Sequence, residues 1–191
     1  QNLNLNVKNG VKMGIIGPNG CGKTTLLRIL NGSEEASNGS YRWAPKARIG
    51  YHSQEHENLD VSRTILDEVL QGRHAHQTMA RIILGRLNIR RDQVNQKIGT
   101  LSVGERSKVA LAKVLFSDFN ILIFDEPTNH VEISAREAFE EALENYNGTV
   151  LLVSHDRYLL DRITNQIFDM EKNRLYQGSY GEYVERSKSS N

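Results

Sequence analysis

The chain has 191 residues, of which 38% are hydrophobic and 25% are charged, and its formal net charge is +1. No segment approaches the roughly 18 consecutive apolar residues of a membrane-crossing helix, so we expect no membrane insertion. The single cysteine excludes an internal disulfide, and no secretory leader pattern opens the chain. We therefore expect one globular domain spanning residues 1–191 in the cytoplasm, and the net charge by itself indicates no partner.

The first seven residues, Gln1 to Val7, alternate polar and apolar side chains and predict a strand. Because this run lacks an initiator methionine, we interpret the chain as an N-terminally incomplete fragment.

An apolar run at 13–16 predicts a buried strand, and the sequence from Leu26 to Leu30 has a helix pattern. Between them stands Gly17-Pro18-Asn19-Gly20-Cys21-Gly22-Lys23-Thr24-Thr25, which matches the G-x-x-x-x-G-K-[ST] pattern of a phosphate-binding loop. Glycines let backbone N–H groups turn inward around phosphates, and the helix N-terminus adds partial positive charge. Lys23 would reach the β- and γ-phosphates, and Thr24 would ligate Mg²⁺. A chance glycine-rich turn is the alternative, and the flanking strand and helix weigh against it.

Cys21 stands at a variable position of this loop, where the simplest role is a small filler. A second hypothesis is a reactive thiol, because Lys23 and the helix N-terminus would favour a thiolate. In that case saturating nucleotide would slow alkylation of Cys21 by a maleimide.

Between residues 62 and 96 the sequence indicates short helices, with 62–70 and 78–87 as examples, and no strong strand. Further on, apolar residues between 131 and 146 recur at helical spacing with four glutamates opposite them, which predicts an amphipathic helix with a solvated acidic face. Apolar runs at 121–124 and 150–153 predict two more buried strands. Strands that alternate with helices are typical of an α/β fold with a mostly parallel sheet.

The predicted strand at 121–124 ends in Asp125 and Glu126. Phosphate-loop enzymes need carboxylates at this carboxyl edge of the sheet. Asp125 would hold Mg²⁺ through water, and Glu126 would orient or polarise the attacking water. The alternative is that two acids simply end a strand and cap the next segment.

Together these motifs resemble the ABC ATPase family over nearly the whole chain. Gln54 resembles the family's Q-loop glutamine, a contact to Mg²⁺ and water, and Ser154-His155-Asp156 resembles its switch histidine. Taken alone, Gln54 would be a surface residue and His155 a core or helix-start histidine with Ser154 as N-cap. The resemblance implies a P-loop NTPase core with a mostly parallel sheet, a helical subdomain at about 60–118 and a small antiparallel β part.

The segment Leu101-Ser102-Val103-Gly104-Glu105 resembles the family's signature motif. Gly104 would permit close approach, Ser102 would supply a hydroxyl, and a helix over 105–116 would point its N-terminus at a phosphate. In the family that phosphate belongs to ATP bound by a second domain, so we expect a head-to-tail pair. The implied catalytic residues are Lys23, Glu126 and His155, the ATP contacts are residues 17–25 with Ser102 and Gly104, and the Mg²⁺ contacts are Thr24, Gln54 and Asp125.

Two residues depart from the family pattern. Val103 replaces the usual glycine, so either this position tolerates ordinary φ or the phosphate contact across the pair is weakened. Glu132 replaces the usual aspartate in the loop after Glu126, and lengthens a carboxylate meant for communication between the two domains. Reduced or asymmetric hydrolysis would follow, with little effect on ATP binding.

The segments 105–113, 126–130, 154–161 and 178–183 resemble the ABC-F branch, whose members carry two fused ATPase domains and act on ribosomes. Because 47 positions separate Gln54 from Leu101, no room remains for the arm insertion of the first ABC-F domain, and the chain resembles the second. The leading hypothesis is an ATPase domain acting on the ribosome, in translation or in antibiotic-resistance ribosome protection, with rRNA or tRNA as partner. The alternatives are a subunit of a membrane transporter and a chromosome or repair ATPase.

One local charge imbalance bears on that partner. Residues 73–100 contain one acid, Asp92, and six basic residues: Arg73, Arg81, Arg86, Arg90, Arg91 and Lys97. Such a surface would favour RNA phosphate. The alternative is a set of solvated helix faces whose charge is balanced by the upstream acids Glu55, Glu57, Asp60, Asp67 and Glu68.

Overall fold

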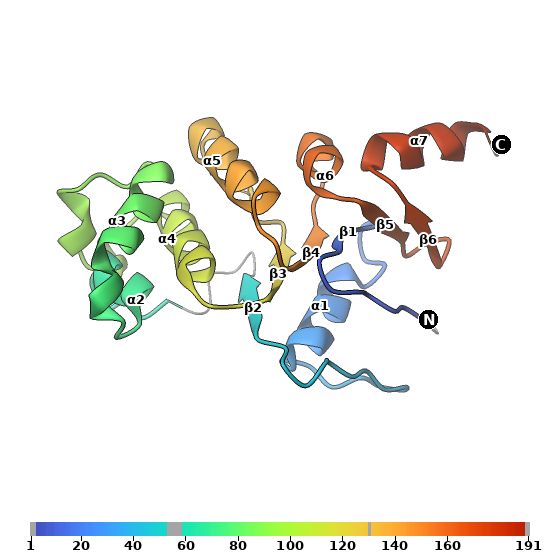
Figure 1. Cartoon of the computed structure of the whole chain (residues 1–191), viewed down its shortest axis with the longest axis horizontal. Coiled ribbons are helices and arrows are strands. Elements are labelled where there is room, and N and C mark those ends of the chain that lie inside the picture. The colour runs from blue at the N-terminus through green and yellow to red at the C-terminus, as the bar shows by residue number, and fades with distance from the viewer. Residues whose placement is uncertain (1–2, 53–58, 130, 190–191) are drawn as a thin grey trace. The chain divides into compact units, whose positions relative to one another are not determined.

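The computed structural model describes residues 3–52, 59–129 and 131–189. Its elements are β1 (Lys12–Ile16), α1 (Lys23–Asn31), β2 (Ile49–His52), α2 (Ile65–Leu70), η1 (His74–His76), α3 (Gln77–Arg86), η2 (Gln93–Asn95), η3 (Ile98–Thr100), α4 (Val103–Phe116), β3 (Ile121–Asp125), α5 (Ile133–Glu144), β4 (Thr149–Val153), α6 (Arg157–Ile163), β5 (Gln166–Asp169), β6 (Arg174–Gln177) and α7 (Tyr180–Ser189). They form two compact units. Figure 1 colours the chain by residue number, from blue at the N-terminus to red at the C-terminus. The sheet unit contains Gln1–Tyr51, Phe119–Glu126 and Tyr146–Asn191, and the helical unit contains His52–Asp118 and Pro127–Asn145.

Six strands form one sheet in the order β2-β3-β4-β1-β5-β6. β3, β4, β1 and β5 are parallel neighbours, and β6 runs antiparallel to β5. Val153 of β4 lies opposite Ile15 of β1 on one side and opposite Asp125 of β3 on the other. The carboxyl ends of β1, β3 and β4 therefore meet at one edge. This α/β fold with a mostly parallel sheet and a small antiparallel part confirms the fold predicted from the sequence.

The two faces of β1 contact different helices. Met13 and Ile15 are fully buried in a cluster with Leu27 of α1. On the opposite face, a Cβ added to Gly14 would lie 3.0 Å from a methyl group of Leu160 in α6. Figure 1 shows α1 below the strands and α6 above them. Glycine at position 14 thus lets α6 pack directly on the backbone of the central strand.

The described part of the N-terminal run, residues 3–7, is not a strand, which corrects the expectation drawn from its alternation. Residues 3–8 have no regular secondary structure. Leu3, Leu5 and Val7 nevertheless pack against the core cluster, while Asn4 and Asn6 are exposed. The alternation therefore reports one buried side of an extended segment, which does not require strand pairing.

The helical unit contains α2, α3, α4 and α5. The predicted helix at 62–70 begins later, at Ile65, because the hydroxyl of Thr64 accepts a hydrogen bond from the Asp67 N–H and caps the helix. The helix predicted over 105–116 begins earlier, at Val103. In α5 the buried side chains are Ala135, Phe139 and Leu143, as the amphipathic pattern predicted. None of the described helices combines the length and hydrophobicity that a membrane crossing requires.

Candidate functional site

The segment between β1 and α1 forms a loop at the carboxyl edge of the sheet. Gly17, Gly20 and Gly22 have φ values of 153°, 76° and 100°, which side chains with a Cβ rarely adopt. Gly22 is the N-cap of α1 and supplies no side-chain acceptor, so the first N–H groups of the helix remain available. A row of backbone donors at a helix N-terminus, in glycines that permit close approach, fits a phosphate group.

Lys23 begins α1 and is only 9% exposed. Its Nζ donates to the carbonyl oxygens of Gly17, at 2.9 Å, and Pro18, at 3.1 Å, so the ammonium lies across the loop. Thr24 and Thr25, which follow in the first turn, are exposed. Cys21 is half-buried and packs against the core cluster, as a small filler would, and the reactivity of its thiol stays a prediction.

Asp125 and Glu126 lie at the same edge, where β3 ends. Asp125 is 3% exposed and Glu126 is 9% exposed. The backbone N–H of Glu126 donates to Val153 at 2.9 Å, which fixes it beside the end of β4. Glu126 has a φ of 49°, a left-handed conformation that is strained for a residue other than glycine, and proline follows it.

His155 is the partner of Glu126. Its backbone N–H donates to Glu126 Oε2 at 3.2 Å, and its Nε2 lies 3.6 Å from Glu126 Oε1. The imidazole is 65% exposed. The alternative interpretation of this segment, with Ser154 as N-cap, is wrong: Asp156 is the N-cap of α6, and its carboxylate accepts from the N–H groups of Tyr158 and Leu159.

Burial raises the pKa of the Glu126 carboxyl above its usual value of 4.5. The backbone N–H and the ring of His155 oppose this rise, Asp125 adds to it, and the charge of Lys23 lowers it. These influences require Lys23, Asp125, Glu126 and His155 to lie near one another. The edge of the sheet thus holds a phosphate-type loop, two carboxyls and an imidazole in one place.

The remaining predicted residues lie elsewhere. Gln54 is outside the described residues. Ser102 and Gly104 belong to the helical unit, where Ser102 is the N-cap of α4. Within residues 3–52, 59–129 and 131–189, no group of three or more His, Cys, Asp or Glu side chains is arranged to hold a metal ion.

Ser102 and Glu105 form a reciprocal cap that sequence reasoning missed, although the S-x-x-E pattern was visible. The Ser102 Oγ accepts from the Glu105 N–H at 3.3 Å, and Glu105 Oε2 accepts from the Ser102 N–H at 2.9 Å. These bonds from Ser102 lower the pKa of Glu105. Val103 is the first residue of α4, with ordinary helical φ, and is 57% exposed. Val103 therefore has ordinary φ in this chain, and the predicted weakening of a phosphate contact across the pair stays a prediction.

A cavity of about 360 Å³ opens beside this cap within the helical unit. Its polar lining includes Arg90, Gln93, Ser102, Glu105, Lys108 and Glu132. Lys108 is 5% exposed, and its Nζ lies 3.0 Å from Glu132 Oε2. Lys108 was not singled out from the sequence, because neither its burial nor this long-range partner has a local signal.

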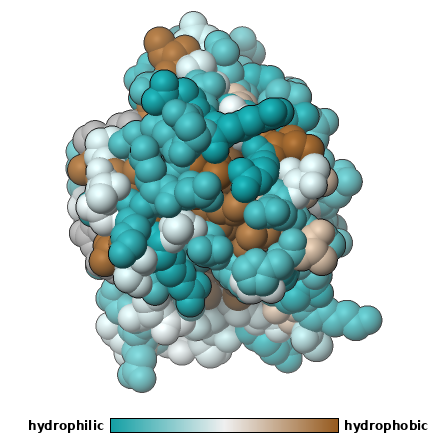
Figure 2. Space-filling view, turned by 90° about the vertical axis from the view of Figure 1, so that its left-hand side faces the viewer, coloured by the Kyte–Doolittle hydropathy of each residue, from teal (hydrophilic) through white to brown (hydrophobic). Residues whose placement is uncertain are grey.

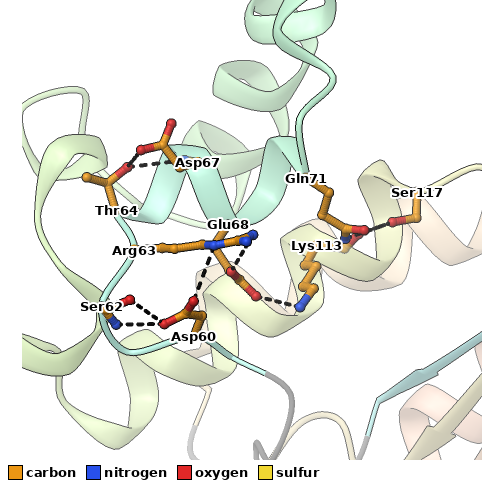
Figure 3. Close-up of polar contacts among 9 residues, drawn as sticks. All are labelled: Asp60, Ser62, Arg63, Thr64, Asp67, Glu68, Gln71, Lys113 and Ser117. Atoms are coloured by element: carbon orange, nitrogen blue, oxygen red, sulfur yellow. Dashed lines mark hydrogen bonds and ion pairs between the residues drawn. The ribbon is translucent and has the colours of Figure 1, made fainter.

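The upstream acids that were expected to balance the basic stretch are largely engaged elsewhere. Figure 3 shows Asp60 paired with Arg63, at 3.3 Å, and Glu68 paired with Lys113 and Arg63. Asp67 accepts from the hydroxyl of Thr64 at 2.7 Å. Glu55 and Glu57 lie outside the described residues.

Four of the six basic residues of this stretch fall into two groups. Arg73 lies 4.6 Å over the ring of Phe116, and Arg90 lies 3.7 Å from Asp92. Arg86 and Arg91 are exposed, and their side chains make no hydrogen bond or ion pair with any described residue. Figure 2 shows this side of the molecule as mostly hydrophilic, with hydrophobic patches between the polar groups.

The comparisons with known proteins agree with this arrangement. A family model described as ABC transporter matches residues 1–129. The chain belongs to this family. "ABC transporter F family member 5" of Arabidopsis thaliana is 36% identical over 96% of this chain and 27% of its own length. "Energy-dependent translational throttle protein EttA" of Escherichia coli K12 is 34% identical over 97% of this chain and 35% of its own length.

Solved structures of the family share the fold. A dimeric structure of the ATP-binding cassette MJ0796 bound to ADP and Pi has a TM-score of 0.79 at 23% identity, and covers 93% of this chain and 89% of that one. The structure "RNase-L Inhibitor" has a TM-score of 0.73 at 29% identity, with 85% and 32% covered. The chain thus spans about a third of the length of the curated relatives that it matches.

Proposed function

We propose that this chain binds ATP and hydrolyses it to ADP and phosphate, within a protein that acts on the ribosome. The observation that carries the proposal is the single sheet edge that holds the glycine loop, Lys23, Asp125, Glu126 and His155. Family membership supports nucleotide binding and hydrolysis in general, and the arrangement of these groups at one edge supports the proposed roles.

Each group has a role that follows from its position. The backbone N–H groups of residues 17 and 19–25 and the Lys23 ammonium would bind the phosphates. The negative charge of the phosphates would then compensate the ammonium group, which donates to two backbone carbonyls in this structure. Thr24 and Asp125 would hold Mg²⁺ together with phosphate oxygens and water, since Mg²⁺ is usually bound through one or two carboxylates and substrate phosphates. When bound, Mg²⁺ would neutralise charge that develops on the phosphates.

Glu126 would accept a proton from the attacking water, or orient that water, as general-base catalysis requires. His155 holds the Glu126 carboxylate through its backbone N–H and leaves an exposed imidazole beside it. That ring would contact a phosphate oxygen or the water itself. Its removal should therefore slow turnover more than it weakens nucleotide binding.

A second domain of the same family would complete the site. Ser102 and the N-terminus of α4 offer a hydroxyl and backbone N–H groups of the kind that bind a phosphate, and the cavity beside them is open. The dimeric cassette structure that shares this fold supports such a pair. We expect the two domains to lie head to tail, with Ser102 and Gly104 directed at nucleotide held by the other domain.

Two observations support the proposed action on the ribosome: the names of the relatives and the charge of exposed arginines. EttA is named as a translational throttle protein, and the structure of an archaeal ribosome recycling factor, aABCE1, has a TM-score of 0.74 at 30% identity over 85% of this chain and 32% of its own. In this chain, the exposed guanidinium groups of Arg86 and Arg91, which pair with no other residue in the described part, favour an RNA phosphate backbone. Both translation control and ribosome protection against antibiotics would use the same ATP cycle.

Cosedimentation of the full-length protein with ribosomes, in the presence of a non-hydrolysable ATP analogue, tests this function. Reversing the charges of Arg86, Arg90 and Arg91 to glutamate should reduce the bound fraction and weaken its salt dependence. The matched control reverses three exposed basic residues of the sheet unit: Lys8, Arg42 and Lys46. If both triple variants bind ribosomes equally well, Arg86, Arg90 and Arg91 do not form an RNA-binding surface. Absence of cosedimentation in the unaltered protein would favour a transporter subunit instead.

A further inference from the structure

Ser154 lies between the two residues that hold Glu126. On one side the carbonyl of Val153 accepts from the Glu126 N–H at 2.9 Å, and on the other the His155 N–H donates to Glu126 Oε2 at 3.2 Å. All four residues belong to the sheet unit. Among the described residues, the His155 N–H is the single hydrogen-bond donor to the Glu126 carboxylate, whose Oε1 accepts none. The orientation of this carboxylate therefore depends on one peptide group, the one that joins Ser154 to His155.

The Ser154 side chain closes a turn around that peptide group. Its Oγ accepts from the backbone N–H of Asp156 at 3.0 Å, and the residue is buried, with 6% exposed. A serine hydroxyl that binds the N–H two residues further on imitates a backbone turn and restricts the dihedral angles of the residue between. That residue is His155. The hydroxyl thus fixes the N–H that Glu126 accepts and the backbone from which the imidazole projects.

The turn is anchored at both ends. It follows β4, whose last residue, Val153, lies opposite Asp125 of β3. It leads into α6, where the Asp156 carboxylate accepts from the N–H groups of Tyr158 and Leu159 at 3.0 and 3.2 Å. Because the strand and the helix hold the two ends, the hydroxyl bond inside the turn decides the conformation between them.

We propose that Ser154 is a positioning residue: its hydroxyl holds the His155 backbone so that the N–H and the imidazole both face the Glu126 carboxylate. The inference rests on the proposed ATPase function. Ser154 acts through His155 and not on the reacting groups themselves. A hydroxyl that only satisfied a buried N–H would add stability and leave turnover unchanged, so the two roles can be separated.

The opposite end of β4 offers a matched control. Thr149 is the first residue of the strand, and its Oγ1 accepts from the backbone N–H of Gly10 at 3.1 Å. Thr149 is 5% exposed, close to the value for Ser154. Each hydroxyl therefore satisfies one backbone N–H at an end of the same strand. The turn at Ser154 encloses a residue that contacts Glu126, whereas the bond at Thr149 lies at the other edge of the sheet.

The test measures kcat and KM for ATP, together with Tm, in the full-length protein. Ser154→Ala should lower kcat by about tenfold or more with KM unchanged, because small displacements of a catalytic group cost this much. Ser154→Cys keeps the volume but is a weak acceptor, and should also lower kcat. Ser154→Thr keeps the hydroxyl and should retain most of kcat. Thr149→Val should lower Tm as Ser154→Ala does, and keep its full kcat below that Tm.

A second measurement asks whether Ser154 acts through Glu126. In a protein that already carries Glu126→Gln, adding Ser154→Ala should lower kcat by no more than about twofold, because a group that acts through the base loses its effect when the base is absent. A further loss as large as that of Ser154→Ala alone would show an independent effect and overturn the proposal.

Three other outcomes would contradict the positioning role. The first is full kcat in both Ser154→Ala and Ser154→Cys. The second is an equal loss of kcat in Ser154→Ala and Thr149→Val, which would report loss of packing alone. The third is a Ser154→Thr variant as slow as Ser154→Ala, because the hydroxyl would then not be the group that matters. If the unaltered protein does not hydrolyse ATP at all, the proposed function itself fails.

Discussion

Replacing Glu126 by glutamine tests the proposed chemistry with little change of shape. The amide oxygen can still accept from the His155 N–H, which now lies 3.2 Å from Oε2. The amide cannot take a proton from water. Loss of a general base typically costs about 10²- to 10⁴-fold in rate, which is about 3–5 kcal/mol in the activation free energy. We therefore expect kcat to fall by this factor while the Kd for ATP stays the same.

The assay is single-turnover phosphate release, with ATP binding measured separately by a fluorescent analogue. In the unaltered protein, kcat should fall on acidification through a pKa above 4.5, because burial raises the pKa of Glu126 and only its ionised form is a base. That acid limb should be absent from the residual activity of Glu126→Gln. Undiminished turnover in this variant would remove Glu126 from the catalytic role.

Three further changes probe other parts of the chain. Lys23→Ala should raise the Kd for ATP by about ten- to a hundredfold, measured by titration, because it removes charged hydrogen bonds to phosphate. Ser102→Ala should lower the free energy of unfolding by about 1 kcal/mol in urea. Because Ser102 lowers the pKa of Glu105, that stabilisation is present above 4.5 and is lost as pH falls through the lowered pKa. Burial and the hydrogen bond to Asp169 raise the pKa of Tyr183 to about 12, so stability falls as pH rises from 10 toward 12. Tyr183→Phe should abolish this alkaline loss in thermal unfolding.

Local patterns in the sequence were sufficient for three adjacent strands of the sheet and for the loop at its edge, whereas β2, β5 and β6 were not predicted as separate strands. The apolar runs at 13–16, 121–124 and 150–153 fall within β1, β3 and β4, because buried parallel strands are apolar on both faces. The positions of Asp125 and of the glycine loop follow from these strands. Parallel strands place their carboxyl ends together, so order along the chain predicts proximity at the edge.

Other features depended on partners that are distant in the sequence. The alternation of residues 1–7 predicted a strand, but burial on one side is all that it encodes, and no strand forms in the described part, 3–7. The left-handed φ of Glu126 has no residue signature, because glycine is the usual marker of such a position. Lys108 and Glu132 are 24 positions apart, and no helical spacing connects them.

The two departures from the family pattern have different physical consequences. Val103 begins α4 with ordinary φ, so its side chain costs the backbone no strain and instead places an exposed apolar group beside Ser102. Glu132 gains one methylene over aspartate, and its carboxylate is hydrogen-bonded to Lys108 of the same chain. A carboxylate held by a buried lysine is less available to a second domain. The longer side chain at 132 therefore makes a contact within the helical unit, between α4 and the start of α5.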